Sequence, residues 1–393
     1  MKSFSRLAAV SSVAIAVVVS LGTPAFAHTR NGSRHEQDRR HEHEHHSARG
    51  AHDVVFVQTD DPAGNSVVAY DRAHDGTLTQ AGTYPTGGNG GILTGSVVDH
   101  LASQASLTYD AKHALLFAVN AGSNTVSVFS VHGDRLNLRE TIASFGQFPV
   151  SIAVHDDLVY VLNALNGGSV QGYRVNSHRL TPIDDSNRAL GLDPAATPQF
   201  VNTPGQVAFS PDGAQLIVTT KANGSAIDVF AVEYHGTLSA SPVVNSEPGT
   251  VPFAVAFDRE GNLVVTEAGT NALATFDLHE DGTITLLHAV PTGQAATCWV
   301  VGSNGQFYAS NAGSASLSRF DSGDGGALTF LDNTTTDGGT VDAAVSAHGD
   351  YLYAQAGAGG IVDEFRINSD GSLAPIGSVT VPNAAGGEGI VAV

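Results

Sequence analysis

Residues 252–290 read PFAVAFDREGNLVVTEAGTNALATFDLHEDGTITLLHAV and contain four short stretches rich in Val, Phe, Leu and Thr. Turn-forming Gly, Asn and Asp separate these stretches, a pattern typical of β-strands joined by tight turns. Before the fourth stretch, Gly282 follows Asp281, and glycine adopts the positive φ of such turns at little cost. The segment therefore predicts four antiparallel strands, the unit of a β-propeller blade. The four stretches are 252–258, 262–268, 272–278 and 283–290.

The third and fourth strands of this unit have counterparts throughout residues 53–393. An aromatic residue ends the third strand, and an apolar residue follows seven or eight positions later. The pair occurs seven times at a base spacing of about 45 residues, which matches a four-stranded blade. Since no stretch of ten or more residues shows a helical period, we expect an all-β protein, a seven-bladed β-propeller. The pairs are Tyr70/Leu78, Phe129/Leu136, Tyr173/Leu180, Phe230/Leu238, Phe276/Ile284, Phe320/Leu328 and Phe365/Leu373.

The two ends of this region predict how the ring closes. Residues 54–58 have the pattern of a second strand, and residues 389–393, GIVAV, have that of an inner strand. Pairing of these strands would complete the first blade from both termini and leave no open sheet edge.

The first 27 residues have the features of a secretory signal peptide. Lys2 and Arg6 precede an apolar run at 7–21, and the sequence Ala-Phe-Ala at 25–27 supplies small residues for cleavage. The run is shorter than the roughly 20 residues that span a bilayer, so an uncleaved anchor is the less favoured alternative. We expect a secreted, extracellular protein without a stable membrane anchor.

Residues 28–52 hold seven histidines, five arginines and four acidic residues but no aliphatic side chain larger than alanine. Such a segment cannot bury enough apolar surface to offset its ordering entropy, so we expect a disordered arm. Two interpretations of the arm stay open: a solvated linker, or a weak site for a divalent metal. No other cofactor is expected. The closely spaced histidines are His41, His43, His45 and His46.

Charge and cysteine content exclude several classes of protein. Residues 1–52 hold seven of the 18 basic and four of the 38 acidic residues, which leaves 11 and 34 in residues 53–393, a net charge of −23. So acidic a surface, in a chain with three lysines, argues against binding of nucleic acid and other anions. The single Cys298 forbids an intrachain disulfide and a multi-cysteine metal site.

Two of the spacings between repeats exceed the others by roughly a dozen residues. The additional residues fall in segments 87–104 and 183–202, each between an outer strand and the next inner strand. Because strands within a blade alternate in direction, these connections emerge on the same face as the turns between second and third strands. Long loops on a rigid scaffold often build binding sites.

Polar residues gather at this face in the predicted fold. Carboxylates and amides around a central funnel suit a hydroxyl-rich ligand or a cation, although the asparagines could simply form the turns. We take Glu267, Asp342 and Glu388 as candidate catalytic bases, and the amides together with Lys221 as candidate ligand contacts. Second strands end at Asn120, Asn163, Lys221, Glu267, Asn311 and Gln355, and inner strands begin near Ser151, Gln206, Asp342 and Glu388.

Two segments resemble the lactonase-type seven-bladed propellers: residues 207–232, VAFSPDGAQLIVTTKANGSAIDVFAV, and 114–131, ALLFAVNAGSNTVSVFSV. This family includes 6-phosphogluconolactonase and the fungal carboxymuconate cyclase. The closing GEGIVAV at 387–393 is also similar, and the resemblance covers nearly all of residues 53–393. It implies a propeller fold and the hydrolysis or formation of a lactone.

The residues that the family uses at its site are replaced in this chain. Members typically open one inner strand with Pro-His-x-His, whereas residues 149–152 read Pro-Val-Ser-Ile. They also carry an Arg-His pair followed about sixteen residues later by a Glu; here Gly205, Gln206 and Lys221 stand in these places. The resemblance therefore implies the scaffold of the family with altered chemistry.

Three functions are compatible with these features. The first is a monomeric, exported, lactonase-like propeller that binds a small neutral or polyhydroxylated ligand, or another surface, at the loop-rich face. The second is a divergent lactonase that uses one of the three carboxylates as a general base. The third is a structural repeat protein, which would be favoured if segment 87–104 blocked the mouth of the channel.

Overall fold

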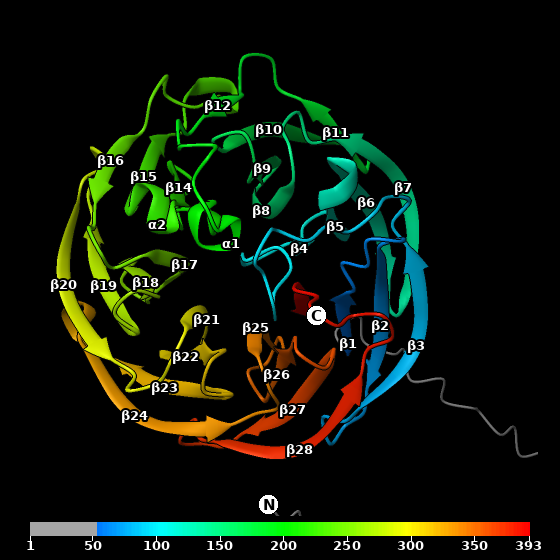
Figure 1. Ribbon diagram of the computed structural model, residues 1–393. Helices are drawn as coiled ribbons and strands as arrows, with labels where there is room; N and C mark the ends of the chain where they lie inside the picture. Colours follow the sequence, from blue (N-terminus) through cyan, green and yellow to red (C-terminus); the bar gives the residue numbers. More distant parts are fainter. Residues whose placement is uncertain (1–52) are drawn as a thin grey trace, which may run out of the picture. The chain divides into compact units, whose positions relative to one another are not determined.

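The computed structural model describes residues 53–393, which fold as a ring of seven antiparallel sheets (Figure 1). Each sheet has four strands in order from the centre of the ring to its rim, and one sheet carries a fifth, short strand, which confirms the predicted seven-bladed, all-β propeller. The predicted signal peptide, 1–27, and the predicted arm, 28–52, lie outside the described residues. In the part that is described, no helix has the length and apolar character needed to cross a membrane.

Six of the blades take their four strands from consecutive stretches of chain. Blade 2 contains β4 (Leu107–Asp110), β5 (Leu115–Asn120), β6 (Thr125–His132) and β7 (Arg135–Ala143); blade 3 contains β8 (Pro149–His155), β9 (Leu158–Asn163), β10 (Ser169–Asn176) and β11 (Arg179–Pro182). Blade 4 contains β13 (Val207–Phe209), β14 (Gln215–Thr219), β15 (Ala226–Ala231) and β16 (Val243–Ser246); blade 5 contains β17 (Pro252–Phe257), β18 (Leu263–Glu267), β19 (Ala272–Leu278) and β20 (Ile284–Pro291). Blade 6 contains β21 (Thr297–Ser303), β22 (Gln306–Asn311), β23 (Ser316–Ser322) and β24 (Leu328–Thr335); blade 7 contains β25 (Thr340–Val345), β26 (Tyr351–Ala356), β27 (Ile361–Ile367) and β28 (Leu373–Thr380).

Blade 1 joins the two ends of the described chain. Its inner strand is β29 (Ile390–Ala392), and its other strands are β1 (Val54–Gln58), β2 (Ser66–Arg72) and β3 (Leu78–Pro85). β29 and β1 pair antiparallel, with Phe56 opposite Val391. The predicted closure is therefore confirmed.

The repeating aromatic residue of each third strand is buried, with at most 2% of its surface exposed. In five blades the register between the third and outer strands shifts at this residue. Such a bulge increases the local twist, which suits a blade whose outer strand wraps the rim. The two blades without the shift at this position are blades 3 and 4, which flank the second long segment.

Two predictions of local structure need correction in blades 3 and 4. Segment 183–202 is not wholly a loop, because it contains β12 (Arg188–Ala189), which pairs with β10, and helix α1 (Gln199–Asn202). Lys221 does not end a second strand: β14 stops at Thr219, and Lys221 begins helix α2 (Lys221–Gly224) with φ +52°. The other short helices are η1 (Ala121–Ser123), η2 (Tyr234–Gly236) and η3 (Asp324–Gly326).

Candidate functional site

Segment 87–104, which we call the central loop, reaches the middle of the ring on the loop-rich face (Figure 1, cyan). The side chain of Gln104 accepts from Val300 N and donates to Val300 O in blade 6, both at 2.9 Å. Ser103 Oγ donates to Val150 O of blade 3 at 2.8 Å, and His100 N donates to Gly386 O beside blade 1 at 2.8 Å. Because one loop is bonded to blades on several sides, it covers the centre of the channel on this face.

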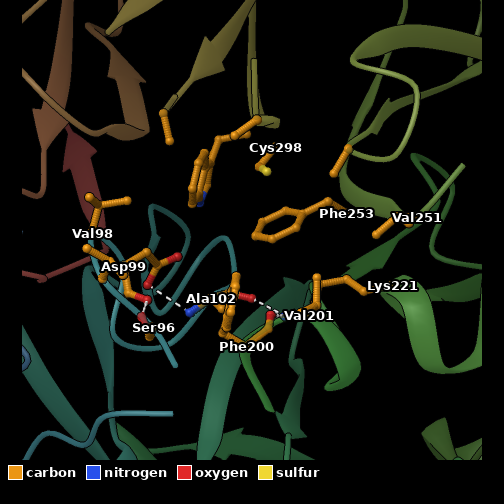
Figure 2. A pocket seen from close by; sticks show the side chains of 15 residues that line it. Ser96, Val98, Asp99, Ala102, Phe200, Val201, Lys221, Val251, Phe253 and Cys298 are labelled. Carbon is orange, nitrogen blue, oxygen red and sulfur yellow. Dashed lines mark hydrogen bonds between the residues drawn. The ribbon is translucent and has the colours of Figure 1, made fainter. Parts of the chain in front are cut away.

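Beside the central loop lies a cavity of about 160 Å³. The central loop and the segment around α1 form one side, and blades 5 and 6 form the other. Val98 and Asp99 face Phe253 and Cys298 across it (Figure 2). The lining residues are Ser96, Val97, Val98, Asp99, Ala102, Phe200, Val201, Lys221, Val251, Phe253, Ala268, Ala296, Cys298, Trp299 and Ala312, most of which are apolar.

Trp299 and Phe253 form the aromatic wall of the cavity. Their rings meet edge-on with centroids 5.1 Å apart, an arrangement that aromatic pairs favour. The indole Nε1 of Trp299 donates to Ser103 O of the central loop at 2.6 Å. The tryptophan therefore presents its apolar surface to the cavity while its polar atom anchors the loop.

Lys221 connects the two long segments to the blades. Its ammonium donates to Ala102 O at 2.6 Å, to Phe200 O at 2.8 Å and to Thr203 Oγ1 at 3.2 Å. Burial lowers the pKa of Lys221 to about 7, while the charge of Asp99 opposes this shift. Three acceptors match the three donors of a protonated lysine, so the geometry favours the charged form.

Asp99 organises the central loop around its own carboxylate. The carboxylate accepts from Leu101 N and Ala102 N at 2.8 Å and from Ser103 N at 3.0 Å. Burial raises the pKa of Asp99 to about 6, and the three N–H donors oppose the shift. The three N–H donors stabilise the ionised form of Asp99, whose charge is opposite to that of protonated Lys221.

Three further carboxyl groups lie beneath the central loop. Glu388 and Asp60 are fully buried and Asp342 is 4% exposed. Asp342 and Glu388 lie close enough to interact, and after burial the charge of Asp342 is the largest cause that raises the pKa of Glu388. Burial raises the pKa of Asp342 and of Asp60 to about 7, and that of Glu388 well above its usual value. This group therefore retains protons near neutral pH.

Glu388 is bonded to the central loop, to Ser106 just after it, and through its backbone to Asp60. Ser103 Oγ donates to Glu388 Oε2 at 3.3 Å, and Ser106 N donates to Glu388 Oε1 at 3.4 Å. Glu388 N donates in turn to Asp60 Oδ2 at 2.9 Å. Any change in the charge of these groups must therefore act on the loop that walls the cavity.

The three candidate bases fall into two places. The structure brings Asp342 and Glu388 together, but Glu267 bonds within its own turn, where its Oε2 accepts from Thr270 Oγ1 at 2.8 Å. Burial raises the pKa of Glu267 as well. None of the three carboxyls lines the cavity.

The candidate amides connect blades or close turns. Gln206 Oε1 accepts from Val255 N at 2.6 Å and so joins the inner strands of blades 4 and 5. Asn120 donates to Ser127 Oγ at 2.8 Å, and Asn311 donates to Ser318 Oγ at 2.9 Å.

Asn163 and Gln355 each keep one atom without a partner among the described residues. Asn163 Nδ2 donates to Ser144 O at 3.1 Å, while its Oδ1 accepts nothing. The Oε1 of Gln355 is likewise buried and unpaired. Neither residue lines the cavity.

Sequence reasoning did not single out Asp60 or Asp99, nor the apolar cavity. Gln58 ends β1 and donates to Asp60 Oδ1, so the second strand of blade 1 has the same polar ending as the others. Extending the comparison of second-strand ends to blade 1 would have singled out Gln58, and with it the neighbouring Asp60. Nothing repeats around Asp99, because the central loop occurs once.

The described residues contain no group of three or more His, Cys, Asp or Glu side chains placed to hold a metal ion. The histidines of the predicted arm lie outside residues 53–393, and the proposed weak metal site stays a prediction. Burial raises the pKa of Cys298 to about 12, so this thiol is unreactive at neutral pH.

Comparison with known proteins identifies a family and several solved structures with this architecture. A family model described as the lactonase seven-bladed β-propeller matches residues 89–385. A structure of a Lactobacillus plantarum protein is 19% identical, with 86% of this chain and 98% of that chain covered and a TM-score of 0.69. The periplasmic gluconolactonase of Pseudomonas aeruginosa is 18% identical, with 86% and 98% covered and a TM-score of 0.68.

A more distant structure shares the same ring. The virginiamycin B lyase of Staphylococcus aureus is 12% identical, with 74% of this chain and 89% of that chain covered and a TM-score of 0.52. At these identities the solved structures show a common fold and carry no activity over. Among curated protein sequences, none matches the chain significantly.

Proposed function

Because the chain belongs to the lactonase family of seven-bladed β-propellers, we propose that it uses this scaffold to bind a small uncharged ligand beside the central loop. The observation that carries the proposal is the cavity of about 160 Å³, walled by both long segments and by blades 5 and 6. Ligand sites in folded proteins are typically concave and apolar with few polar groups. The protein acts as an exported monomer, and its partner is a small molecule or an extracellular surface.

Two observations support export. The first 27 residues have the pattern of a signal peptide, and one structural neighbour is described as periplasmic. A strongly acidic propeller outside the cytoplasm would not encounter or retain a phosphorylated sugar. Binding of nucleic acid is disfavoured for the same electrostatic reason.

The positions where the family carries its site residues serve the fold in this chain. Ser151 Oγ accepts from Val207 N at 3.2 Å, and Gln206 accepts from the next inner strand. Lys221 is occupied by three acceptors. These contacts support a member of the family that has lost its usual catalytic residues.

Direct binding and turnover measurements test this function. A panel of aldonolactones and simple lactones should show saturable binding or none, but no hydrolysis above the uncatalysed rate. Turnover that saturates with lactone concentration would overturn the proposal in favour of the enzymatic alternative. The central loop covering the channel is also what the structural-repeat hypothesis requires, and absence of any ligand would favour that hypothesis.

A divergent lactonase is the second candidate, and one observation favours it. Asp342 and Glu388 interact, and burial raises the pKa of both, so one group could donate a proton to the leaving oxygen while its partner activates water. Both lie beneath Ser103, so the central loop would have to open for substrate to reach them.

Three variants test the enzymatic candidate. If the pair is catalytic, Glu388→Gln and Asp342→Asn should each lower kcat by about 100-fold or more. Glu267→Gln is the matched control, because its carboxylate bonds to Thr270 in a separate turn. Equal activity of all three variants would remove the pair from the mechanism.

A further inference from the structure

We infer that the cavity accepts an uncharged, apolar molecule with a single ring, and that it discriminates against sugars and anions. This inference rests on the proposed binding function and names the class of ligand. Size, lining, charge and the rim of the cavity each support it.

Size limits the ligand to roughly one ring. The cavity measures about 160 Å³, and an apolar cavity of about 150 Å³ in an unrelated protein holds one benzene molecule. A ligand of about six to ten non-hydrogen atoms fills such a space. A sugar with a phosphate group exceeds it.

The lining offers few hydrogen bonds to a ligand. Trp299 Nε1 is already bonded to Ser103 O, and the ammonium of Lys221 is bonded to three oxygens. A polyhydroxylated ligand would give up bonds to water that these groups cannot replace, which costs free energy for each unpaired hydroxyl. Asp99 and the hydroxyl oxygen of Ser96 are the lining side chains that keep spare lone pairs, so the site suits a ring with few hydroxyl donors.

Charge excludes anions from the same space. Lys221 is the only cation among the lining residues, and Asp99 balances it. The buried carboxyls of Asp60, Asp342 and Glu388 interact electrostatically with Asp99. An anionic ligand would therefore enter without a free counter-charge, at a high desolvation cost.

The rim shows where apolar surface remains to be covered. Val97 lines the cavity and is 81% exposed, which leaves an apolar side chain in water at its mouth. A ligand that packs against Val97 removes this surface from water, which favours an apolar partner.

The chain supplies its own probe for the test, because Trp299 is its only tryptophan and lines the cavity. Titration of the full protein with benzyl alcohol should change its tryptophan fluorescence saturably. Benzoate, which has a similar size but carries a charge, should bind at least about tenfold more weakly. Gluconolactone should produce no saturable change.

Two pairs of variants connect the signal to the cavity. Val97→Ser should weaken benzyl alcohol binding several-fold, while Val244→Ser, which alters a valine 62% exposed on the rim of blade 4, should not. Ala312→Leu should fill the cavity and abolish binding, while Ala289→Leu on the exposed strand β20 should leave it unchanged.

The outcomes separate this inference from the proposed function. Saturable binding of gluconolactone but not of benzyl alcohol would overturn the ligand class and keep the binding function. Binding of benzyl alcohol that survives Ala312→Leu would place the site elsewhere and overturn the inference. No response to any of the three probes would count against the binding function itself.

Discussion

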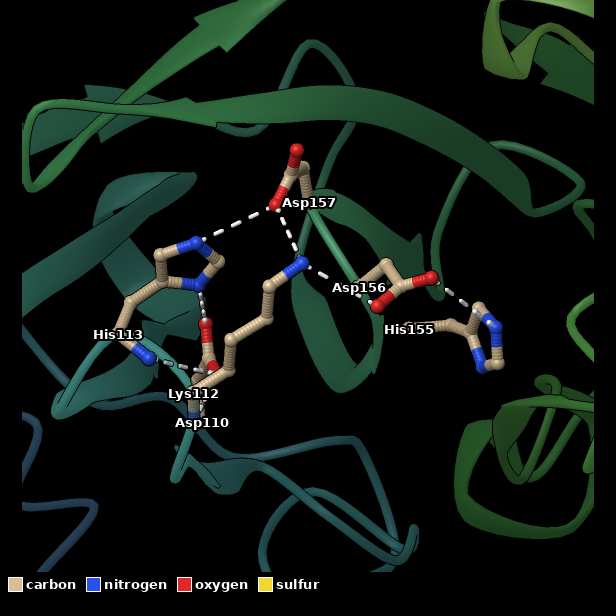
Figure 3. Close-up of polar contacts among 6 residues, drawn as sticks. All are labelled: Asp110, Lys112, His113, His155, Asp156 and Asp157. Carbon is tan, nitrogen blue, oxygen red and sulfur yellow. Dashed lines mark hydrogen bonds and ion pairs between the residues drawn. The ribbon is translucent and has the colours of Figure 1, made fainter.

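The two lysines of residues 53–393 occupy opposite ends of the propeller and opposite electrostatic environments. Lys221 is 1% exposed beside the cavity, whereas the side chain of Lys112 is 52% exposed in the turn between β4 and β5. Lys112 Nζ lies 3.2 Å from Asp156 Oδ1 and 2.9 Å from Asp157 Oδ1 (Figure 3). Both lysines thus have acceptor oxygens within reach, and they differ in their access to water.

The difference shows what burial does to a charged group. Hydrogen bonds to Asp157 and Asp156 raise the pKa of Lys112, because exposed carboxylates favour its charged form. Burial lowers the pKa of Lys221 despite three bonded oxygens and a nearby carboxylate. Contacts at the exposed end are replaceable by water, whereas contacts at the buried end hold the site together.

The largest expected effect comes from removing the buried lysine, Lys221. Lys221→Met leaves Ala102 O and Phe200 O without a donor and Asp99 without its counter-charge. We expect a loss of about 3–5 kcal/mol in the free energy of unfolding, measured by chemical denaturation.

Lys112→Met is the matched control for this change. Its ion pairs are open to solvent, so its denaturation midpoint should not shift measurably. Equal destabilisation by the two substitutions would show that burial does not distinguish the two ends.

A second prediction concerns the pH dependence of stability at the buried end. A carboxyl whose folded pKa is raised stabilises the fold at low pH and loses this contribution as the pH rises through the folded pKa. Burial raises the pKa of Glu388, and the charges of Asp342, Asp99 and Asp60 add to this shift. The wild-type protein should therefore lose stability between about pH 4.5 and neutral pH or above.

Glu388→Gln should flatten this dependence, because an amide resembles the protonated carboxyl and has no proton to lose. At pH 8, above neutrality, the variant should be more stable than the wild type. Thermal unfolding across pH, with Glu267→Gln as the control, measures it. A variant with the wild-type slope would remove Glu388 as the group responsible.

The same contrast explains what the sequence could predict. Seven aromatic residues repeat because each blade needs the same buried side chain, so the fold, the blade count and the closure of β1 on β29 were all predictable. The central loop occurs once and contacts blades distant in sequence, as Trp299 to Ser103 illustrates. The sequence repeat therefore gives no indication of such contacts.

At the site, residue type alone could not show whether a polar side chain binds a ligand or bonds to other strands of the protein. Asn120 and Gln206 stand at strand ends, as residues that bind a ligand would, but they bond to other strands of the protein. Buried polar groups must find partners whatever their function. The pairing of Asp342 with Glu388 required three-dimensional positions, because it joins blade 7 to the last strand.

A third prediction compares two carboxylates that each organise a turn. Asp99 accepts three backbone N–H groups in the central loop, and Asp110 accepts Lys112 N and His113 N near the exposed end. Asp99→Asn replaces one carboxylate oxygen by an amide nitrogen that cannot accept a hydrogen bond. If this is the oxygen that accepts from Ser103 N, the amide proton of Ser103 should exchange with solvent about tenfold faster. Asp110→Asn should change exchange less at Lys112, because Lys112 is exposed to water although the side chain of Asp110 is only 4% exposed. Hydrogen exchange measured by NMR gives both values, and a larger effect of Asp110→Asn would reverse the comparison.

The smallest expected effect is the raised pKa of Lys112, which high salt should lower. Residues 28–393 contain only Lys112 and Lys221, so lysine labelled with ¹³C at Cε gives two NMR signals. Lys221 should titrate below Lys112, since burial lowers one pKa and the aspartates raise the other. At about 1 M salt the screening length falls to about 3 Å, so the pKa of Lys112 should fall toward its ordinary value while that of Lys221 stays unchanged. Equal responses of both signals to salt would mean that water reaches Lys221, and the cavity would then be open to solvent at its base.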